Sequence, residues 1–262
     1  MGSLEGRNVL VTGSSRGIGE YMAKYFSMAG AKVAIAARTT EVTDKRLPGT
    51  IYSVAEEIRE EGGVATSVRM NMRDPDSIRD GVAQTVEELG GLDIVVNNAA
   101  ILVPGSLETV QERHIDLIWQ IDLRGPLLLM KHALPHLKKN DVSDIINISS
   151  IAAVFPGPGP YEDMPKRREG SFYGMVKAGL ERFSQGLARE LQPHNVKVNI
   201  LSPQGRILTP GNVWADNDPD NPDLEFEAAD EMGKAGVWIC EQTYSYTGNI
   251  LYDQVLCRAK NL

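Results

Sequence analysis

Tyr173 and Lys177 stand four positions apart in a stretch, Ser171–Leu191, whose apolar residues follow the period of a helix. Side chains with this spacing project from one helical face, about one turn apart. Ser149 and Ser150 end the strand expected before this helix, where a hydroxyl can hydrogen-bond the oxygen of a bound carbonyl or alcohol. The phenol, the ammonium and a serine hydroxyl could therefore form a proton-transfer site, because a neighbouring ammonium favours the phenolate.

A glycine-rich turn follows the first apolar run of the chain. The stretch Val9–Gly19 passes from apolar residues into three glycines and then into an amphipathic segment, Glu20–Ala29, which predicts strand, turn and helix. Glycine at positions 13, 17 and 19 permits a close backbone approach, so that N–H groups at the helix N-terminus can face an anion. We expect a dinucleotide pyrophosphate here, although such a turn is also ordinary loop chemistry.

Two other chemistries fit parts of the sequence less well. Gly13–Gly17 also matches G-x-S-x-G, the nucleophile elbow of serine hydrolases, but this serine follows the first strand and no histidine follows His194. His132 and His136 are four apart and could hold a metal, but Pro135 intervenes and no third ligand is evident. We therefore expect neither a hydrolase nor a metal site.

The composition is that of an ordinary soluble globular protein. The 262 residues are 42% hydrophobic, and 27 basic against 35 acidic residues give a net charge of −8. This balance disfavours nucleic acid or an anionic membrane as a partner. Cys240 and Cys257 have no C-x-x-C spacing and are interpreted as reduced thiols. With neither a signal-peptide pattern nor an apolar run of membrane-spanning length, the chain is expected to be cytoplasmic.

Strand and helix signals alternate along the chain, beginning with the strand at Val9. This alternation predicts an α/β fold: a doubly wound parallel sheet of about seven strands with helices on both faces and ligands at the carboxyl ends of the strands. Further strands are expected at Lys32–Ala37, Val64–Met70, Leu92–Asn97, Asp144–Ser149, Val196–Leu201 and Asn249–Tyr252. Helices are expected at Thr50–Glu61, Pro75–Leu89, Leu107–Lys139 with a break near Gly125-Pro126, Ser171–Leu191 and Ala228–Glu241.

Two irregular segments interrupt this pattern, and no second domain is evident, so residues 1–262 are expected to form one domain. Ile151–Gly170 carries four prolines and the basic cluster Lys166-Arg167-Arg168, and is interpreted as an insert at the substrate mouth. Gly205–Glu227 is rich in Asp, Asn and Pro and contains Trp214, which suggests a lid-like segment at about 205–232. A solvated loop is the alternative for this second segment.

Four motifs in order resemble the short-chain dehydrogenase/reductase family, and the resemblance covers nearly the whole chain. It implies a Rossmann-type fold in which Tyr173 is the acid/base, Lys177 binds the nicotinamide ribose and lowers the Tyr173 pKa, and Ser150 orients the substrate oxygen. Leu47–Ile51 and the proline-rich insert are similar to the citronellol-type and hydroxysteroid-dehydrogenase-like branch. The motifs are Thr12-Gly13-x-x-x-Gly17-x-Gly19, Asn97-Asn98-Ala99-Ala100, Ile148-Ser149-Ser150 and Tyr173-x-x-x-Lys177, followed by Asn199-x-x-Ser202-Pro203 and Tyr246-Thr247-Gly248.

The chain departs from this family at two positions. Asp122 stands where the family usually has a catalytic asparagine, so a kink-stabilising and water-holding amide becomes a carboxyl, and we place Asp122 with Ser150, Tyr173 and Lys177 as a candidate catalytic residue. Gln204 replaces the usual glycine after Pro203, near the expected nicotinamide carboxamide. The resemblance implies cofactor contacts from Gly13, Ser15, Arg16, Gly17, Ile18, Gly19, Arg38, Asn71, Met72, Asn98, Ala99, Tyr173, Lys177, Pro203, Gln204 and Thr209.

Charge at the end of the second strand bears on the choice of cofactor. An acidic residue there would bind a ribose 2′-hydroxyl, whereas a cation would pair with a 2′-phosphate. The chain has Ala37 followed by Arg38, with Arg16 in the glycine turn, which favours NADP(H) over NAD(H). We expect an oxidoreductase that interconverts an alcohol and a ketone or aldehyde on an apolar small molecule, as a homodimer or homotetramer. An NAD(H)-dependent dehydrogenase and a catalytically impaired dinucleotide-binding protein remain alternatives.

Overall fold

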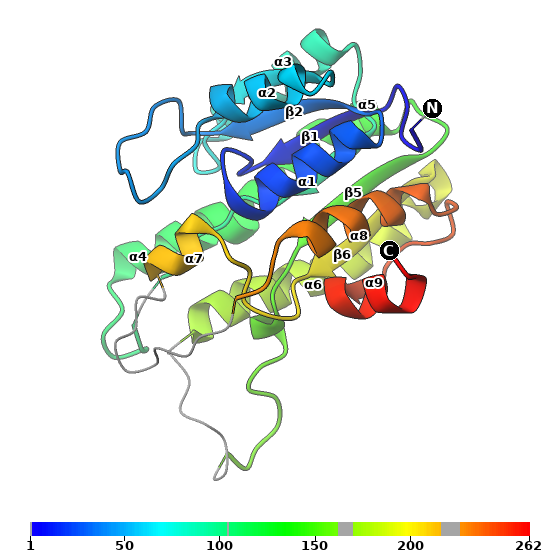
Figure 1. The fold of residues 1–262 in the computed structure, drawn as a ribbon. Coiled ribbons are helices and arrows are strands. Elements are labelled where there is room, and N and C mark those ends of the chain that lie inside the picture. The colour runs from blue at the N-terminus through cyan, green and yellow to red at the C-terminus, as the bar shows by residue number, and fades with distance from the viewer. Residues whose placement is uncertain (1, 104, 162–169, 216–225) are drawn as a thin grey trace.

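All strands of the central sheet run parallel. The computed structural model describes residues 2–103, 105–161, 170–215 and 226–262. The strands in these ranges are β1 Asn8–Thr12, β2 Lys32–Ala37, β3 Val64–Arg69, β4 Ile94–Asn97, β5 Ser143–Ile148, β6 Val196–Ser202 and β7 Ile250–Tyr252. They pair in the order β3-β2-β1-β4-β5-β6-β7. The first three strands therefore extend the sheet in one direction from β1, and the strands from β4 onward extend it in the other. The predicted doubly wound parallel sheet is confirmed (Figure 1).

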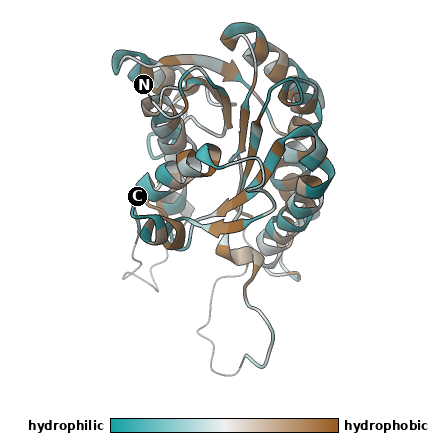
Figure 2. Ribbon diagram, turned by 90° about the vertical axis from the view of Figure 1, so that its right-hand side faces the viewer, coloured by the Kyte–Doolittle hydropathy of each residue, from teal (hydrophilic) through white to brown (hydrophobic). Residues whose placement is uncertain are grey.

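Helices cover both faces of this sheet. One face packs against α1, α2, α8 and α9, and the other packs against α3, α5 and α6. In Figure 2 the strands are mostly brown, and the helices around them carry teal segments. The helices are α1 Gly17–Met28, α2 Ile51–Glu60, α3 Pro75–Leu89, α4 Glu112–Ile118, α5 Gly125–Leu137, α6 Ser171–Leu191, α7 Pro210–Ala215, α8 Asp230–Glu241 and α9 Asp253–Lys260.

Strand β1 shows why the apolar runs are continuous. Val9 and Val11 belong to the core that contains α1 and α8, whereas Leu10 belongs to the core that contains α3 and α5. Successive side chains of a strand point to opposite faces, so a strand covered on both faces needs apolar residues at every position. The short apolar runs seen in the sequence are therefore central parallel strands rather than half-exposed ones.

The helical stretch before β5 differs from its expected form. A break was expected near Gly125-Pro126, but α4 continues through a π-helical turn, Trp119–Arg124, directly into α5. Pro126 lies in the first turn of α5, where a helix does not require the missing N–H group. A Cβ at Gly125 would lie 2.7 Å from the Met72 carbonyl oxygen, so glycine is required here for close packing.

Two further elements were not expected from the sequence. The segment Gly205–Glu227, interpreted as irregular, contains α7, and residues 216–225 lie outside the described residues. Its ends pair through a parallel bridge between Ile207 and Glu227, with the Leu208 N–H donating to the Glu227 carbonyl oxygen at 2.7 Å. The chain then ends in α9, whose eight residues were too few to give a helical period.

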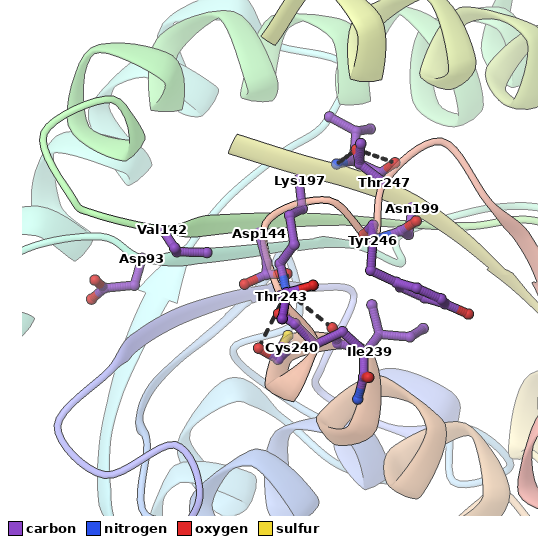
Figure 3. A network of polar contacts seen from close by, with 12 residues as sticks. Asp93, Val142, Asp144, Lys197, Asn199, Ile239, Cys240, Thr243, Tyr246 and Thr247 are labelled. Carbon is purple, nitrogen blue, oxygen red and sulfur yellow. Dashed lines mark hydrogen bonds and ion pairs between the residues drawn. The ribbon is translucent and has the colours of Figure 1, made fainter. Parts of the chain in front are cut away.

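A buried lysine connects the amino ends of β5 and β6 to α8 (Figure 3). The Lys197 side chain is fully buried, and its Nζ lies 2.9 Å from Asp144 Oδ1, while Arg7 Nη2 lies 3.1 Å from Asp144 Oδ2. Lys197 Nζ also donates to the Ile239, Cys240 and Gln242 carbonyl oxygens at 3.1, 3.3 and 2.7 Å. The ammonium therefore caps the C-terminal end of α8, where a positive charge is favourable.

The carboxyl ends of the strands lie at the sheet edge opposite this network. They place the residues after β1, β2, β4, β5 and β6 together, and these include the glycine turn, Arg38, Asn98, Ser150 and Pro203. Within the described ranges, no helix combines the length and apolar character needed to cross a bilayer. The same part of the chain holds no group of three or more His, Cys, Asp or Glu residues arranged to hold a metal ion.

Candidate active site

The glycine turn is held against the end of β4. Asn98 Nδ2 donates to the Thr12 and Gly13 carbonyl oxygens at 2.9 and 3.2 Å, and Thr12 Oγ1 accepts from the Asn98 and Ala99 N–H groups. A Cβ on residue 19 would lie 2.4 Å from Asn98 Nδ2. Glycine at this position is therefore required by packing on Asn98. The motifs at Thr12 and Asn98, far apart in sequence, form one hydrogen-bonded unit.

Helix α1 presents an uncapped N-terminus at this turn. Gly17, its first residue, has φ +62°, and the preceding Arg16 makes no side-chain capping hydrogen bond. The first N–H groups of a helix lack intrahelical partners and can face an anion. Ser15 is buried and Ile18 packs at the edge of the core, while Thr209 lies 3.1 Å from the place of a Cβ on Gly17. The turn therefore fits the pyrophosphate of a dinucleotide.

A cavity of about 320 Å³ lies where β2 and β3 end. Arg38 and Arg69 line it together with Asn71, Asp74 and Ser77. Arg69 pairs with Ala37 across the two strands, which explains how its side chain comes to stand beside Arg38. Arg69 was not among the residues expected from the sequence, although an arginine at the end of a strand next to β2 was a usable signal. Two guanidinium groups at one cavity suit a phosphate.

Arg16 was expected to be the second cation near Arg38, and it does not line that cavity. Its Nε donates to the Pro48 carbonyl oxygen at 2.9 Å, and its Nη2 donates to the Gly49 carbonyl oxygen at 3.0 Å. Arg16 thus holds the loop before α2 against the glycine turn. Of the other expected contacts, Met72 is buried in the core, and Thr209 lines a second cavity of about 560 Å³ between this loop and α7.

Ser150, Tyr173 and Lys177 come together beside the end of β5. The Ser150 and Tyr173 hydroxyl groups are hydrogen-bonded to each other. Lys177 Nζ lies 5.5 Å from the centroid of the Tyr173 ring and donates to the Ile148 carbonyl oxygen at 2.9 Å. Lys177 is only 2% exposed, so α6 and β5 hold its ammonium in one place. The three residues singled out from the sequence therefore share one site.

The environment raises the pKa of Tyr173 rather than lowering it. Burial of the phenol raises its pKa most, the Lys177 charge lowers it, the Asp122 charge raises it, and the hydrogen bond with Ser150 lowers it. The expected effect of Lys177 is present, but desolvation outweighs it. Without a further positive charge the phenol keeps its proton at neutral pH and is a proton donor.

Asp122 lies in the π-helical turn and is fully buried. Its Oδ1 accepts from the Ile101 N–H at 2.9 Å, whereas its Oδ2 has no hydrogen-bond partner among the described residues. Burial raises the pKa of Asp122 to about 6, against the opposing effects of the Lys177 charge and the Ile101 hydrogen bond. Asp122 therefore makes a hydrogen bond that holds the π-helical turn to the segment after β4, and it adds a titratable carboxyl to the site.

A second buried carboxyl lies one turn beyond Lys177. Glu181 is 7% exposed, and its Oε1 accepts from Ser149 Oγ at 2.6 Å. Burial raises the pKa of Glu181, while the Ser149 hydrogen bond and the Lys177 charge lower it. Glu181 was not expected from the sequence, although its spacing of four from Lys177 and eight from Tyr173 places it on the same helical face.

The backbone after β6 is anchored by another carboxylate. The Gln204 N–H donates to Asp253 Oδ1 at 2.9 Å, and Asp253 is fully buried at the start of α9. The Gln204 side chain is exposed, and Pro203 before it is partly buried. The departure from the usual glycine therefore leaves the backbone at Gln204 fixed. Nothing in the sequence marked Asp253, because its role depends on α9 returning to β6.

An apolar cluster lies beside Tyr173. Val103, Ile118 and Val176 are its buried members, and Tyr173 and Phe172 pack against it from α6. This cluster joins the segment after β4 to α4 and α6. One side of the candidate site is therefore formed by hydrocarbon groups, which suit an apolar substrate.

Comparisons with known proteins agree with this arrangement. A family model described as short chain dehydrogenase matches residues 7–218. Hydroxysteroid dehydrogenase-like protein 2 of Bos taurus is 33% identical over the whole of this chain, which spans 60% of that relative's length. A short chain dehydrogenase structure from Mycobacterium thermoresistibile is 32% identical with a TM-score of 0.83, covering 99% of this chain and 89% of that one. One from Burkholderia cenocepacia J2315 in complex with NADP is 29% identical with a TM-score of 0.79, covering 95% of this chain and 97% of that one.

Proposed function

This chain belongs to the short chain dehydrogenase family, and we propose that it is an NADP(H)-dependent oxidoreductase that interconverts an alcohol and a ketone or aldehyde on an apolar small molecule. The observation that carries the proposal is the hydrogen bond between Ser150 and Tyr173, with Lys177 5.5 Å from the phenol ring. These residues lie at the same sheet edge as the glycine turn. Proton transfer and dinucleotide binding would therefore occur side by side.

The reaction needs one hydride and one proton. A bound nicotinamide dinucleotide supplies or accepts the hydride at the substrate carbon. In reduction the Tyr173 hydroxyl gives its proton to the substrate oxygen and becomes a phenolate, and in oxidation the phenolate takes the proton back. Ser150 holds the substrate oxygen by a hydrogen bond, and the Lys177 ammonium stabilises the phenolate. The charge on the phenolate is thus balanced at the moment when it forms.

Support for NADP(H) comes from the cavity at the ends of β2 and β3. Arg38 and Arg69 both line it, and among the described lining residues Asp74 is the one that is acidic. A ribose 2′-phosphate carries the charge that such a pair of guanidinium groups binds best. The NADP complex of the Burkholderia relative is consistent with this choice. An NAD(H)-dependent enzyme of the same family is the alternative.

A substrate screen tests the proposal. The full chain is incubated with aliphatic, terpenoid and steroid carbonyls and alcohols, and nicotinamide absorbance is followed with NADP(H) and with NAD(H). We expect turnover of at least one apolar compound and a lower KM for NADP(H). Binding of a dinucleotide with no turnover across the panel would instead support a catalytically impaired binding protein.

A further inference from the structure

The carboxyl of Asp122 is the feature of the site that the proposed function leaves unexplained. It is fully buried, and within the described part of the chain only one of its two oxygens is hydrogen-bonded, to the Ile101 N–H. An unpaired buried polar atom is costly, and natural proteins retain few of them. An asparagine would keep the Ile101 hydrogen bond without a charge. The carboxyl therefore differs from an amide at this position by the negative charge that it can carry.

The charges around Asp122 show on which groups this charge acts. The π-helical turn packs against α4, α5 and α6, and α6 supplies Lys177 and Tyr173. No ionisable group of α4 or α5 within the described residues shifts the pKa of this carboxyl. The Lys177 charge also acts on Glu181, which accepts a hydrogen bond from Ser149. The buried ammonium thus interacts electrostatically with two carboxyls, and the hydrogen bond that it donates within the described residues goes to the Ile148 carbonyl oxygen.

This balance of charge disfavours a second negative group. When Asp122 is ionised, its charge offsets that of Lys177, so the formation of a Tyr173 phenolate adds an uncompensated negative charge to a site of low polarity. When Asp122 is protonated or replaced by an amide, the Lys177 charge is free to stabilise the phenolate. The charge of residue 122 is therefore coupled to the ionisation of Tyr173 in two ways, by its own effect on the phenolate and by offsetting the Lys177 charge.

We propose that Asp122 is a positioning residue whose carboxylate keeps the proton on Tyr173, so that the site works as a carbonyl reductase over a wider pH range than as an alcohol dehydrogenase. This rests on the proposed function and adds a preferred direction to it. Reduction starts from the protonated phenol and releases a phenolate, so it continues to higher pH when Asp122 holds the proton in place. Oxidation starts from the phenolate and begins only at higher pH. The equilibrium between alcohol and carbonyl is unchanged, because only the pH dependence of each rate is altered.

Titration of Tyr173 tests the proposal without any substrate. The ultraviolet absorbance of phenolate is recorded against pH for the wild type and for Asp122→Asn, and the spectrum of the corresponding Tyr173→Phe protein is subtracted from each. We expect Tyr173 in Asp122→Asn to ionise at a pH lower by on the order of one unit, because a nearby negative charge has been removed. An unchanged or higher ionisation pH in Asp122→Asn would overturn the proposal.

Two further proteins make this comparison specific. Asp116→Asn removes an equal charge from the exposed surface of α4 and is expected to leave the Tyr173 titration where it is. Asp122→Ser removes the same charge as Asp122→Asn with a different side chain, and it serves if the asparagine variant does not fold. A shift of equal size in Asp116→Asn would show that net charge, and not the position of Asp122, is responsible.

The kinetic arm uses a substrate found in the screen. In Asp122→Asn the alkaline decline of reduction and the rise of oxidation should both move to lower pH by the same amount as the Tyr173 titration. Profiles that coincide with the wild type would also overturn the proposal. Absence of turnover in the wild type would refute the proposed function, whereas the spectroscopic titration would still decide the role of Asp122.

Discussion

Ser149 and Ser150 are adjacent in sequence and have different roles because they leave the end of β5 on opposite sides. Ser149 is buried and donates to Glu181, whereas Ser150 is hydrogen-bonded to Tyr173. The sequence motif contains both serines, and only the alternation of a strand separates the one that faces the site from the one that faces the interior. Single residues of this site are therefore understood from the direction in which they leave an element.

Tyr173 is the residue on which the proposed chemistry depends. Tyr173→Phe keeps the ring and removes the hydroxyl, so we expect turnover to fall by about 10²- to 10⁴-fold while dinucleotide binding persists. Lys177→Met should impair both turnover and binding. The measurements are kcat and the cofactor dissociation constant on a substrate from the screen. Near-normal turnover of Tyr173→Phe would place the proton donor elsewhere.

Asp122 should also affect stability in a pH-dependent way. The pKa of Asp122 in the folded protein is about 6, above the ordinary value of 3.8. The stability that comes from this shift is therefore fully present below about pH 3.8 and is lost as the pH rises through about 6. We expect Asp122→Asn to exceed the wild type in free energy of unfolding by about 3 kcal/mol at pH 7 and by less than about 1 kcal/mol at pH 4. Urea unfolding at both values measures this. A difference that does not change with pH would contradict it.

Arg38 and Arg69 should each discriminate between the two cofactors. Replacing either by serine removes charge-assisted hydrogen bonds to a 2′-phosphate, so NADPH binding should weaken by roughly 10- to 100-fold and NADH binding by much less. Arg79→Ser on the exposed face of α3 is the matched control and should leave both affinities unchanged. Equal losses for NADPH and NADH in Arg38→Ser would refute the phosphate assignment.

At the scale of elements, the π-helical turn Trp119–Arg124 shows how a small change in helical winding serves the site. It turns Asp122 into the interior, toward the Ile101 N–H, while α4 and α5 continue on either side. The sequence indicated an interruption nearby, at Gly125-Pro126, because those residues are usual helix breakers. The change in helical winding lies within a few residues of the expected position, but it is a π-helical turn and not a break in the helix.

The insert before α6 should govern substrate range. Its first residues, Ile151–Ala153, form a short 3₁₀ helix that packs on α6, and a Cβ at Gly174 would lie 2.6 Å from the Ala152 carbonyl oxygen. Residues 154–161 then run away from the body of the molecule, and Lys166-Arg167-Arg168 lie outside the described residues (Figure 1). Deleting Pro156–Arg168 is expected to change relative kcat/KM across the substrate panel. NADPH affinity should stay within about twofold, since the glycine turn is untouched.

At the scale of the whole molecule, the buried ion pair of Lys197 and the candidate active site lie at opposite ends of the strands. Lys197 and Asp144 belong to the amino ends of β6 and β5, and the proposed catalytic residues lie beside the carboxyl end of β5. We expect Lys197→Met to lower the free energy of unfolding by about 3–5 kcal/mol, because Asp144 would lose a buried ion-pair partner. Activity per folded molecule should remain. The exposed Lys131→Met in α5 is the control, and a loss of equal size there would contradict this role.

The sequence by itself determined the fold class and most elements. Continuous apolar runs and the 3.6-residue period are local properties, so β2, α3 and α6 have the bounds expected from them. The glycine turn and the pair Tyr173 and Lys177 were likewise recognisable, because their spacing along one strand end or one helical face already places them together.

Only the tertiary structure decided which distant groups meet. Arg69 lies beside Arg38, Asp253 holds the backbone at Gln204, and Lys197 reaches the end of α8 because strands far apart in sequence pair in the sheet. The pKa shifts of Asp122 and Tyr173 belong to this second group, since burial and neighbouring charge are consequences of packing. A short-range pattern can specify a helix or a strand, whereas electrostatics at the site depend on distances that only the folded chain sets.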